Sequence, residues 1–299
     1  MKIGYPCVNR SIGCSGSRTF RLKNYSPERM IETTGNNLDC LLEMLKYNQQ
    51  HNILFFRISS DLVPFASHPV CKFDWLGHFQ RDFQEVGTFI RVHDMRISMH
   101  PDQFVVINSP DKGVVERSVA ELRYHAQVLD LMQLDDSAKI QIHVGGVYRD
   151  KQGSIARFID RYERLDSSIR KRLVIENDDI SYTLNDCLII HEATGIPVLF
   201  DSFHHLLNNS GEPLGEVIDL ISSSWRKDDG IPMCDYSSQQ EGERKGRHAE
   251  TIDAYDFKEF LKASLKFDFD IMLEIKDKEK SALQAIRIAS QDSRLILSP

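Results

Sequence analysis

The sequence alternates between short, apolar, β-rich runs and longer helical patterns, and it does so eight times. The expected strands are residues 2–7, 53–58, 96–100, 139–143, 172–176, 197–201, 231–235 and 270–274. The expected helices are residues 38–50, 76–93, 116–134, 154–164, 184–194, 213–224, 256–265 and 279–289. Short continuous apolar runs are typical of parallel strands that are buried on both faces. Eight such units in succession predict an α/β fold, a single (β/α)8 TIM barrel.

An open, doubly wound sheet is the competing interpretation of the same alternation. The sequence has neither the G-x-G-x-x-G turn that follows the first strand in dinucleotide-binding sheets nor a lysine loop that cradles phosphate. The barrel is therefore favoured. Because a barrel of roughly 250 residues forms one domain, we expect residues 1–299 to form a single TIM-barrel domain. A hydrophobic content of 41% is enough for its core.

Six of the expected strands end, in succession, on side chains that can bind metals. They are His100, His143, Glu176, Asp201, Asp235 and Glu274, at intervals of about 35 residues, which is the length of one βα unit. Since the carboxyl ends of barrel strands meet at one mouth, these side chains should converge there. A single strand-end histidine or glutamate is more often a hydrogen-bonded rim residue, but six in a row favour a metal site.

The residue types at these positions restrict the chemistry. Imidazole with carboxylate and no thiolate suits Mn²⁺, Zn²⁺ or Fe²⁺, whereas Mg²⁺ usually prefers oxygen ligands alone. Six ligands exceed the needs of one catalytic ion, so we expect two or three ions, bridged by Glu176 or Asp201. His204 and His248 follow strands six and seven and are candidates to bind a third ion. Two ions about 3.5–4 Å apart are used for in-line displacement at phosphorus.

The other histidines have no partners at matching positions, so we interpret them as hydrogen-bonded or packed side chains. They are His51, His68, His78, His93, His125 and His191, and His205 is expected to pack beside His204. For His204 and His248 the structural role and the ligand role both stay open.

The six cysteines include no C-x-x-C pair, and we expect reduced thiols rather than disulfides or a zinc ribbon. The sequence has no run of about 18 apolar residues, and its first residues lack the apolar stretch of a signal peptide. These features predict a cytoplasmic protein without a membrane partner. No sustained apolar stripe predicts an obligate dimer, so a monomer is expected.

The formal net charge of −7 argues against nucleic-acid binding by bulk charge alone. A polyanionic substrate would need local basic patches or bound cations. Two expected loops, residues 8–33 and 236–251, carry basic side chains. The candidate phosphate contacts in these loops and after strand four are Arg18, Arg21, Lys23, Arg149, Lys151, Arg244, Lys245 and Arg247. Exposed solubilising charge is the alternative for each of them.

The sequence resembles the UV damage endonuclease family over nearly its whole length. The resemblance lies in the segments IGYPCVN (3–9), FRISS (56–60), VPFASHP (63–69), SMHPDQF (98–104), IHVGG (142–146), IENDD (175–179), FDSFHH (200–205) and MLEIK (272–276). It implies a barrel with a trinuclear, manganese-preferring site. It also implies incision of double-stranded DNA immediately 5′ to cyclobutane pyrimidine dimers and 6-4 photoproducts, without ATP. Some members also cut at abasic sites.

The resemblance implies roles for individual residues. One ion would bind to His100, His143 and Glu176, a second to Glu176, Asp201, Asp235 and Glu274, and a third to His204 and His248. Many members carry a lysine and a histidine on strand seven where Met233 and Asp235 stand here. Asp235 can still bind a metal but Met233 cannot, so occupancy of the third site stays open.

Four further residues match positions that contact the lesion in the family. Gln103 and Phe104 correspond to a dipeptide that fills the gap when the damaged dinucleotide leaves the stack. An amide and an aromatic ring can replace lost pairing and stacking, and a distorted lesion costs less to flip. Tyr5 and Asn9 correspond to residues that line the lesion pocket.

These residues predict metal-assisted phosphodiester hydrolysis that leaves a 3′-hydroxyl and a 5′-phosphate, with Glu176, Asp201 and Glu274 as catalytic carboxylates. An abasic-site endonuclease on the same barrel would use the same ligands. A metal-dependent sugar isomerase would have no use for Gln103 and Phe104. A non-catalytic lesion-binding protein would tolerate the loss of Glu176.

Overall fold

In a computed structural model of the protein, eight parallel strands close into a barrel, in chain order from β1 to β8. The model describes residues 1–209, 211 and 213–298. The strands are β1 Ile3–Pro6, β2 Phe55–Ile58, β3 Arg96–Met99, β4 Lys139–His143, β5 Leu173–Glu176, β6 Val198–Asp201, β7 Met233–Tyr236 and β8 Asp270–Leu273. Closure pairs β1 with β8, so no described strand is left as an open edge.

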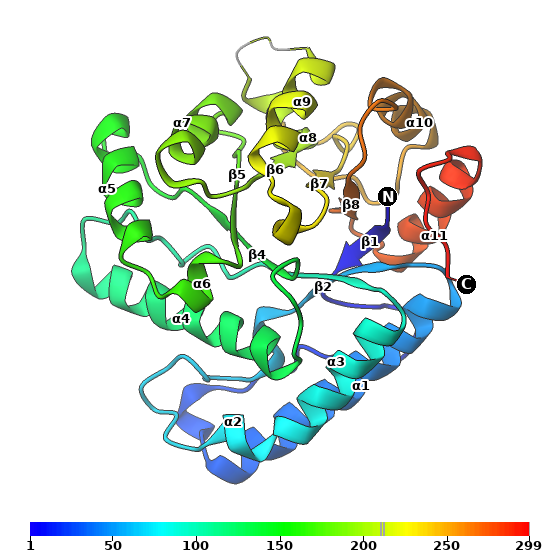
Figure 1. Cartoon of the computed structure of the whole chain (residues 1–299). Helices are drawn as coiled ribbons and strands as arrows, with labels where there is room; N and C mark the ends of the chain where they lie inside the picture. The colour runs from blue at the N-terminus through cyan, green and yellow to red at the C-terminus, as the bar shows by residue number, and fades with distance from the viewer. Residues whose placement is uncertain (210, 212, 299) are drawn as a thin grey trace.

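Helices form a ring outside the strands (Figure 1). They are α1 Pro27–Gln50, α2 Trp75–His78, α3 Gln80–Val92, α4 Lys112–Leu131, α5 Lys151–Glu163, α6 Ser167–Arg170, α7 Leu184–Thr194, α8 Ser202–Leu207, α9 Leu214–Ser224, α10 Ala254–Ala263 and α11 Glu279–Ile288. The (β/α)8 barrel predicted from the sequence is therefore confirmed. Of the predicted domain, positions 210, 212 and 299 lie outside the described residues.

The helix α1 begins eleven residues before the expected start at Leu38. Its N-cap is Ser26, whose hydroxyl accepts a hydrogen bond from the Arg29 N–H at 3.2 Å, and Pro27 is the first helical residue. Proline at this position loses no helical hydrogen bond, because the first N–H groups of a helix have no partner within it. The expected loop of residues 8–33 is correspondingly shorter and ends at Ser26.

The expectation of six reduced cysteines is wrong for one pair, since Cys14 and Cys40 form a disulfide with a Cα–Cα distance of 5.9 Å. The two residues are 26 positions apart and meet because the loop after β1 folds back on α1. Asn37, also on α1, binds the same loop: its side chain accepts from the Arg18 N–H at 2.9 Å and donates to the Arg18 carbonyl at 3.0 Å. The basic loop is thus fixed to the barrel.

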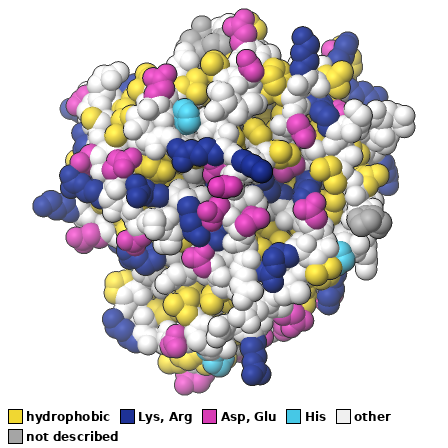
Figure 2. Space-filling view, in the orientation of Figure 1, with side chains coloured by type: hydrophobic (Ala, Val, Ile, Leu, Met, Phe, Trp, Pro, Cys, Tyr) yellow, Lys and Arg dark blue, Asp and Glu magenta, His cyan; other side chains and the backbone are white. Residues whose placement is uncertain are grey.

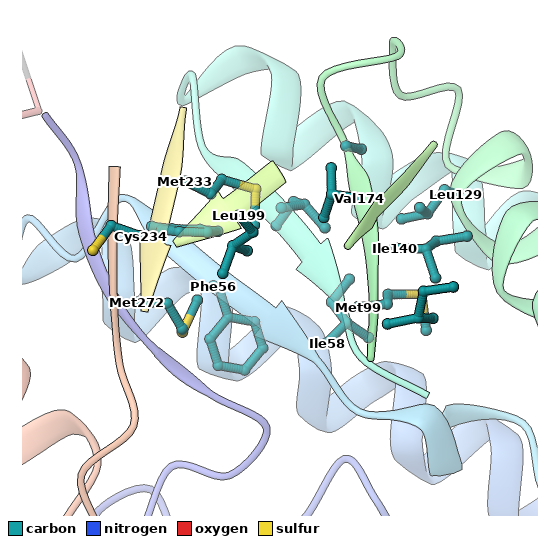
Figure 3. Close-up of a cluster of buried hydrophobic side chains, with 14 of the residues drawn as sticks. Phe56, Ile58, Met99, Leu129, Ile140, Val174, Leu199, Met233, Cys234 and Met272 are labelled. Atoms are coloured by element: carbon teal, nitrogen blue, oxygen red, sulfur yellow. The ribbon is translucent and has the colours of Figure 1, made fainter. Parts of the chain in front are cut away.

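Apolar side chains from β5 to β8 lie inside the barrel beneath its mouth. Because side chains on a strand alternate between faces, the residue two positions before each strand-end carboxylate points to the same side. These residues are Val174, Leu199, Met233 and Met272, all buried and labelled in Figure 3. Met233 stands where many members of the UV damage endonuclease family carry a lysine. It is buried among the apolar side chains directly beneath the strand-end carboxylates.

The face seen in Figure 2 carries Lys and Arg side chains interspersed with Asp and Glu, so charges of both signs are mixed over it. The two ends of the chain meet, since the Met1 amino group donates to the Arg294 carbonyl at 2.7 Å. Among the described residues, no helix combines the length and apolar character that a membrane crossing requires.

Candidate metal centre

His100, His143 and Glu176 form a first cluster, with one potential ligand atom from each within 4.8 Å of the others. His143 and Glu176 are partners in the β4–β5 register, and Glu176 Oε1 lies 2.9 Å from His143 Nε2 and 3.7 Å from His100 Nε2. The parallel ladder places them side by side because both end their strands. This cluster can hold one cation.

Asp201, Asp235 and Glu274 form a second cluster by the same criterion. Asp201 ends β6, its register partner Asp235 is the next-to-last residue of β7, and Glu274 directly follows β8. Asp201 and Asp235 are buried and Glu274 is half-buried. All six side chains predicted to converge therefore lie at the carboxyl ends of their strands, in two groups of three.

Backbone carbonyls orient three of the imidazoles. His100 Nδ1 lies 2.9 Å from the Pro101 carbonyl oxygen, His204 Nδ1 3.1 Å from that of Asn177, and His248 Nδ1 2.9 Å from that of Glu274. A carbonyl can only accept, so each Nδ1 carries a proton, and Nε2 is the ring nitrogen that can bind a metal. Metal-binding histidines are held in this tautomer in the same way.

The four imidazoles follow one another around the mouth, with ring centroids 5.3 Å apart for His100 and His143, 6.0 Å for His143 and His204, and 6.2 Å for His204 and His248. Among residues 1–209, 211 and 213–298, His204 and His248 belong to no group of three potential ligands. They are adjacent, as the sequence predicted, but the described residues give them no third partner of their own.

Electrostatics of the two clusters favour bound cations. Burial opposes the charge of Glu176, but the His143 and His100 imidazoles outweigh it and hold the pKa of this carboxyl well below its usual range. In the second cluster, burial and the Glu274 and Glu176 carboxylates raise the pKa of Asp201 well above its usual range. Few positive side chains balance these closely spaced carboxylates, and a bound divalent ion would neutralise their charge.

The donor set also fits such ions. His143 Nδ1 is buried and has no hydrogen-bond partner among the described residues. Imidazole and carboxylate together, without thiolate, match borderline divalent ions. The two clusters are therefore positioned to bind metal ions.

Arg57 is a member of this centre that the sequence reasoning missed. Its side chain is 3% exposed, and Nη2 lies 2.8 and 2.7 Å from the two oxygens of Asp235. Its Nη1 donates to Glu274, and Gln141 Oε1 accepts from Nη2 at 2.7 Å. The available signal was a single charged residue inside the apolar run of β2, Phe55–Ile58.

Two cavities open beside the centre. One of about 430 Å³ is lined by Arg57, His100, Gln103 and Glu274 among others, and one of about 490 Å³ by His100, Gln103 and His143 among others. The segment that follows β3 therefore separates two hollows at the mouth. A larger cavity of about 1010 Å³ lies outside, along α8 and α10, and contains none of the eight predicted ligands.

The predicted lesion contacts fall into two groups. Gln103 and Phe104 are exposed, with Phe104 53% accessible. Tyr5 and Asn9 are 0% and 1% exposed and bind each other, because the Asn9 amide donates to the Tyr5 hydroxyl at 2.9 Å. The Tyr5 hydroxyl donates in turn to Asn48 on α1. In this conformation, Tyr5 and Asn9 are not accessible to a ligand.

The predicted phosphate contacts are spread over several loops. Exposed side chains are Arg18, Arg21, Lys23, Arg149, Arg244, Lys245 and Arg247. Arg247 pairs with Glu243 at 2.9 Å, and the half-buried Lys151 pairs with Asp186 at 2.6 Å. Their charge is thus partly neutralised within the protein.

Four of the other histidines contact backbone carbonyls or aromatic rings. His51, His125 and His191 each place Nδ1 within 2.9 Å of a backbone carbonyl, and the ring of His205 packs against Phe200. None of these four histidines belongs to a group of potential metal ligands among the described residues.

Comparison with known proteins identifies the family. A model described as UV-endonuclease UvdE matches residues 1–296. The chain belongs to this family. It is 36% identical to a UV DNA damage endonuclease of Clostridium perfringens, covering 100% of this chain and 73% of that one. It is 34% identical to one of Bacillus thuringiensis subsp. konkukian, covering 96% and 94%.

Solved structures agree with the UvdE assignment. SacUVDE superimposes with a TM-score of 0.94 at 44% identity, covering 99% of this chain and 100% of that one. Endonuclease IV from Thermus thermophilus reaches a TM-score of 0.56 at 14% identity, which shows a shared fold alone. Membership of the UvdE family makes the protein a DNA repair endonuclease, a hydrolase whose substrate is DNA.

Proposed function

We propose that the protein nicks double-stranded DNA immediately 5′ to UV photoproducts, both cyclobutane pyrimidine dimers and 6-4 photoproducts. The reaction is hydrolytic, needs no ATP and leaves a 3′-hydroxyl and a 5′-phosphate. The observation that carries this proposal is the pair of ligand clusters at one barrel mouth, linked by the Gln141 amide, which donates to Glu176 in the first cluster and to Asp235 in the second. Membership of the UvdE family supports the choice of damaged DNA.

In this proposal His100, His143 and Glu176 would hold one ion, and Asp201, Asp235 and Glu274, together with Glu176, would hold a second. His204 and His248 would hold a third. Mn²⁺ is the favoured ion, with Zn²⁺ and Mg²⁺ as alternatives, because imidazole and carboxylate ligands are mixed. Such ions, when bound, supply Lewis-acid stabilisation of charge on the phosphate oxygens. Glu176, Asp201 and Glu274 keep these positions fixed from rigid strand ends.

The loop after β3 selects the lesion. Gln103 and Phe104 enter the duplex and fill the gap that the flipped dinucleotide leaves, since their exposure allows an amide and a ring to replace pairing and stacking. Tyr5 and Asn9 support the pocket from beneath rather than touch DNA in the conformation described. The exposed arginines and lysines of the loops contact phosphates and position the duplex.

The whole chain acts as one domain and as a monomer in this proposal, in the cytoplasm, where a prokaryotic cell keeps its nucleoid. Abasic sites are a second substrate to be tested rather than a separate function.

The test is incision of an end-labelled duplex that carries one defined cyclobutane dimer, run with Mn²⁺ and again with EDTA. Undamaged and abasic duplexes of the same sequence are the controls. We expect a metal-dependent cut directly 5′ to the dimer. Lesion binding without a cut would point to a recognition protein, and cutting of the abasic duplex alone would point to an abasic-site endonuclease.

A further inference from the structure

Among the described residues, two basic residues have a positive φ, Arg149 and Lys278. Lys278 has φ 56° and ψ −114°, a conformation that a side chain with a Cβ rarely adopts and that glycine adopts freely. Residues held in such conformations gather at functional sites, where the surrounding structure keeps them in place. Lys278 immediately precedes α11 and lies four residues after Glu274.

Both neighbours of Lys278 are anchored. Asp277 accepts a hydrogen bond from the Thr251 hydroxyl, and Glu279 accepts from the Arg10 N–H at 3.0 Å and from the Ser11 hydroxyl at 2.6 Å. The Lys278 N–H donates to the Ile275 carbonyl at 3.2 Å, which closes a tight turn. The turn therefore holds Lys278 in its conformation from both sides.

The side chain of Lys278 lines the cavity of about 430 Å³ that also exposes His100, Gln103 and Glu274. That cavity joins the metal ligands to the residue that we expect to enter DNA. Within the part of the chain that the structure describes, Lys278 makes no ion pair within 4.0 Å, although the neighbouring Lys276, in the same cavity, pairs with Glu250 at 2.7 Å. Lys278 is thus a cation that the protein leaves available at the mouth.

We propose that Lys278 binds a backbone phosphate of the DNA beside the metal centre, and that its unfavourable backbone conformation is retained to aim the ammonium group into the cavity. A protein with a net charge of −7 needs such local cations to hold a polyanion near a cluster of carboxylates. The proposal rests on the proposed function, because it assumes that DNA lies across this mouth.

The test compares Lys278→Met, Lys278→Gly and Lys278→Arg with the control Lys276→Met. Binding of a duplex with one cyclobutane dimer is measured by fluorescence anisotropy in EDTA, between 50 and 200 mM salt. Lys278→Met should weaken binding about tenfold at the lower salt and reduce the slope of log Kd against log salt by about 0.9. Lys278→Arg should restore both, and Lys276→Met should change neither.

Lys278→Gly separates a functional role from a structural one. It should weaken binding as Lys278→Met does, while the urea midpoint of unfolding rises because glycine relieves the backbone conformation. Wild-type binding and salt slope in Lys278→Met, or an equal loss in Lys276→Met, would overturn the proposal. Wild-type protein that binds the dimer duplex no better than undamaged duplex would instead count against the proposed function itself.

Discussion

His143 and Glu176 face each other across the β4–β5 pair, and His143 Nε2 lies 2.9 Å from Glu176 Oε1. Burial alone would lower the pKa of His143, but the Glu176 carboxylate outweighs it and raises that pKa from 6.5 to about 9. In the protein without metal, the protonated His143 imidazole therefore balances the negative charge of Glu176.

This pair makes metal binding and the stability of the metal-free protein depend on pH in opposite directions. The ion pair stabilises the metal-free fold fully below about pH 6.5 and is lost as the pH rises through about 9, because the folded pKa is the higher one. Metal binding requires neutral His143, so affinity should rise across the same window. Calorimetric titration with Mn²⁺ in two buffers at about pH 7.5 should detect release of a proton. Binding without proton release would contradict the assignment of His143.

Glu176→Gln should abolish incision and leave the fold intact. The amide has the size of the carboxylate but neither its charge nor its ability to bridge two ions. Loss of residues that merely support ligands costs about 10–100-fold, so loss of this ligand should cost at least about 100-fold in incision rate. The matched control is Glu163→Gln, the same change on the exposed face of α5. Full activity of Glu176→Gln would contradict the assignment of Glu176 as a bridging ligand.

The barrel and the positions of its ligands could be predicted because one pattern determines both. In a parallel barrel each strand end reaches the same mouth, so the order His100, His143 and Glu176 along the chain becomes proximity in space. This inference needs only the strand boundaries. The register of β4 with β5 agrees with it, because His143 pairs directly with Glu176.

Other features depend on contacts that have no periodic signal. The Cys14–Cys40 disulfide joins a loop to a helix, and the spacing of two cysteines does not reveal which loop folds back. The early start of α1 has a local signal in the sequence, Ser26-Pro27, but this signal is not part of an apolar period. The role of Arg57 could not be predicted from the sequence, because its partners Asp235 and Glu274 lie more than 170 residues away along the chain.

Arg57→Met should destabilise the protein strongly because it leaves Asp235 buried without its cation. Breaking a buried pair by removing one partner costs about 3–5 kcal/mol, whereas replacing both partners by apolar residues is close to neutral. The free energy of unfolding in urea, measured without metal, should therefore fall by about that amount in Arg57→Met. It should recover in the double variant Arg57→Met/Asp235→Leu. A double variant as unstable as the single one would show that the ion pair is not the cause.

Phe104→Ala should weaken recognition of the lesion while leaving the metal centre unchanged. Phe104 is 53% exposed in the loop after β3, so its removal leaves no internal cavity and the fold should keep its stability. Stacking of a base on an aromatic ring contributes about 1–3 kcal/mol, which corresponds to about 5–150-fold in Kd for a dimer-containing duplex. Anisotropy in EDTA measures this loss. Tyr255→Ala, which removes a similarly exposed ring from α10, is the control and should bind as the wild type does.

The same series tests whether the ring stacks or only fills space. Phe104→Trp keeps a π-face and should retain the affinity for the dimer duplex, whereas Phe104→Leu keeps apolar volume without one and should lose most of what Phe104→Ala loses. Binding of undamaged duplex should not change in any of the three, because an intact stack leaves no gap for the ring to fill. Equal losses on damaged and undamaged DNA would show that Phe104 contributes general affinity and does not discriminate lesions.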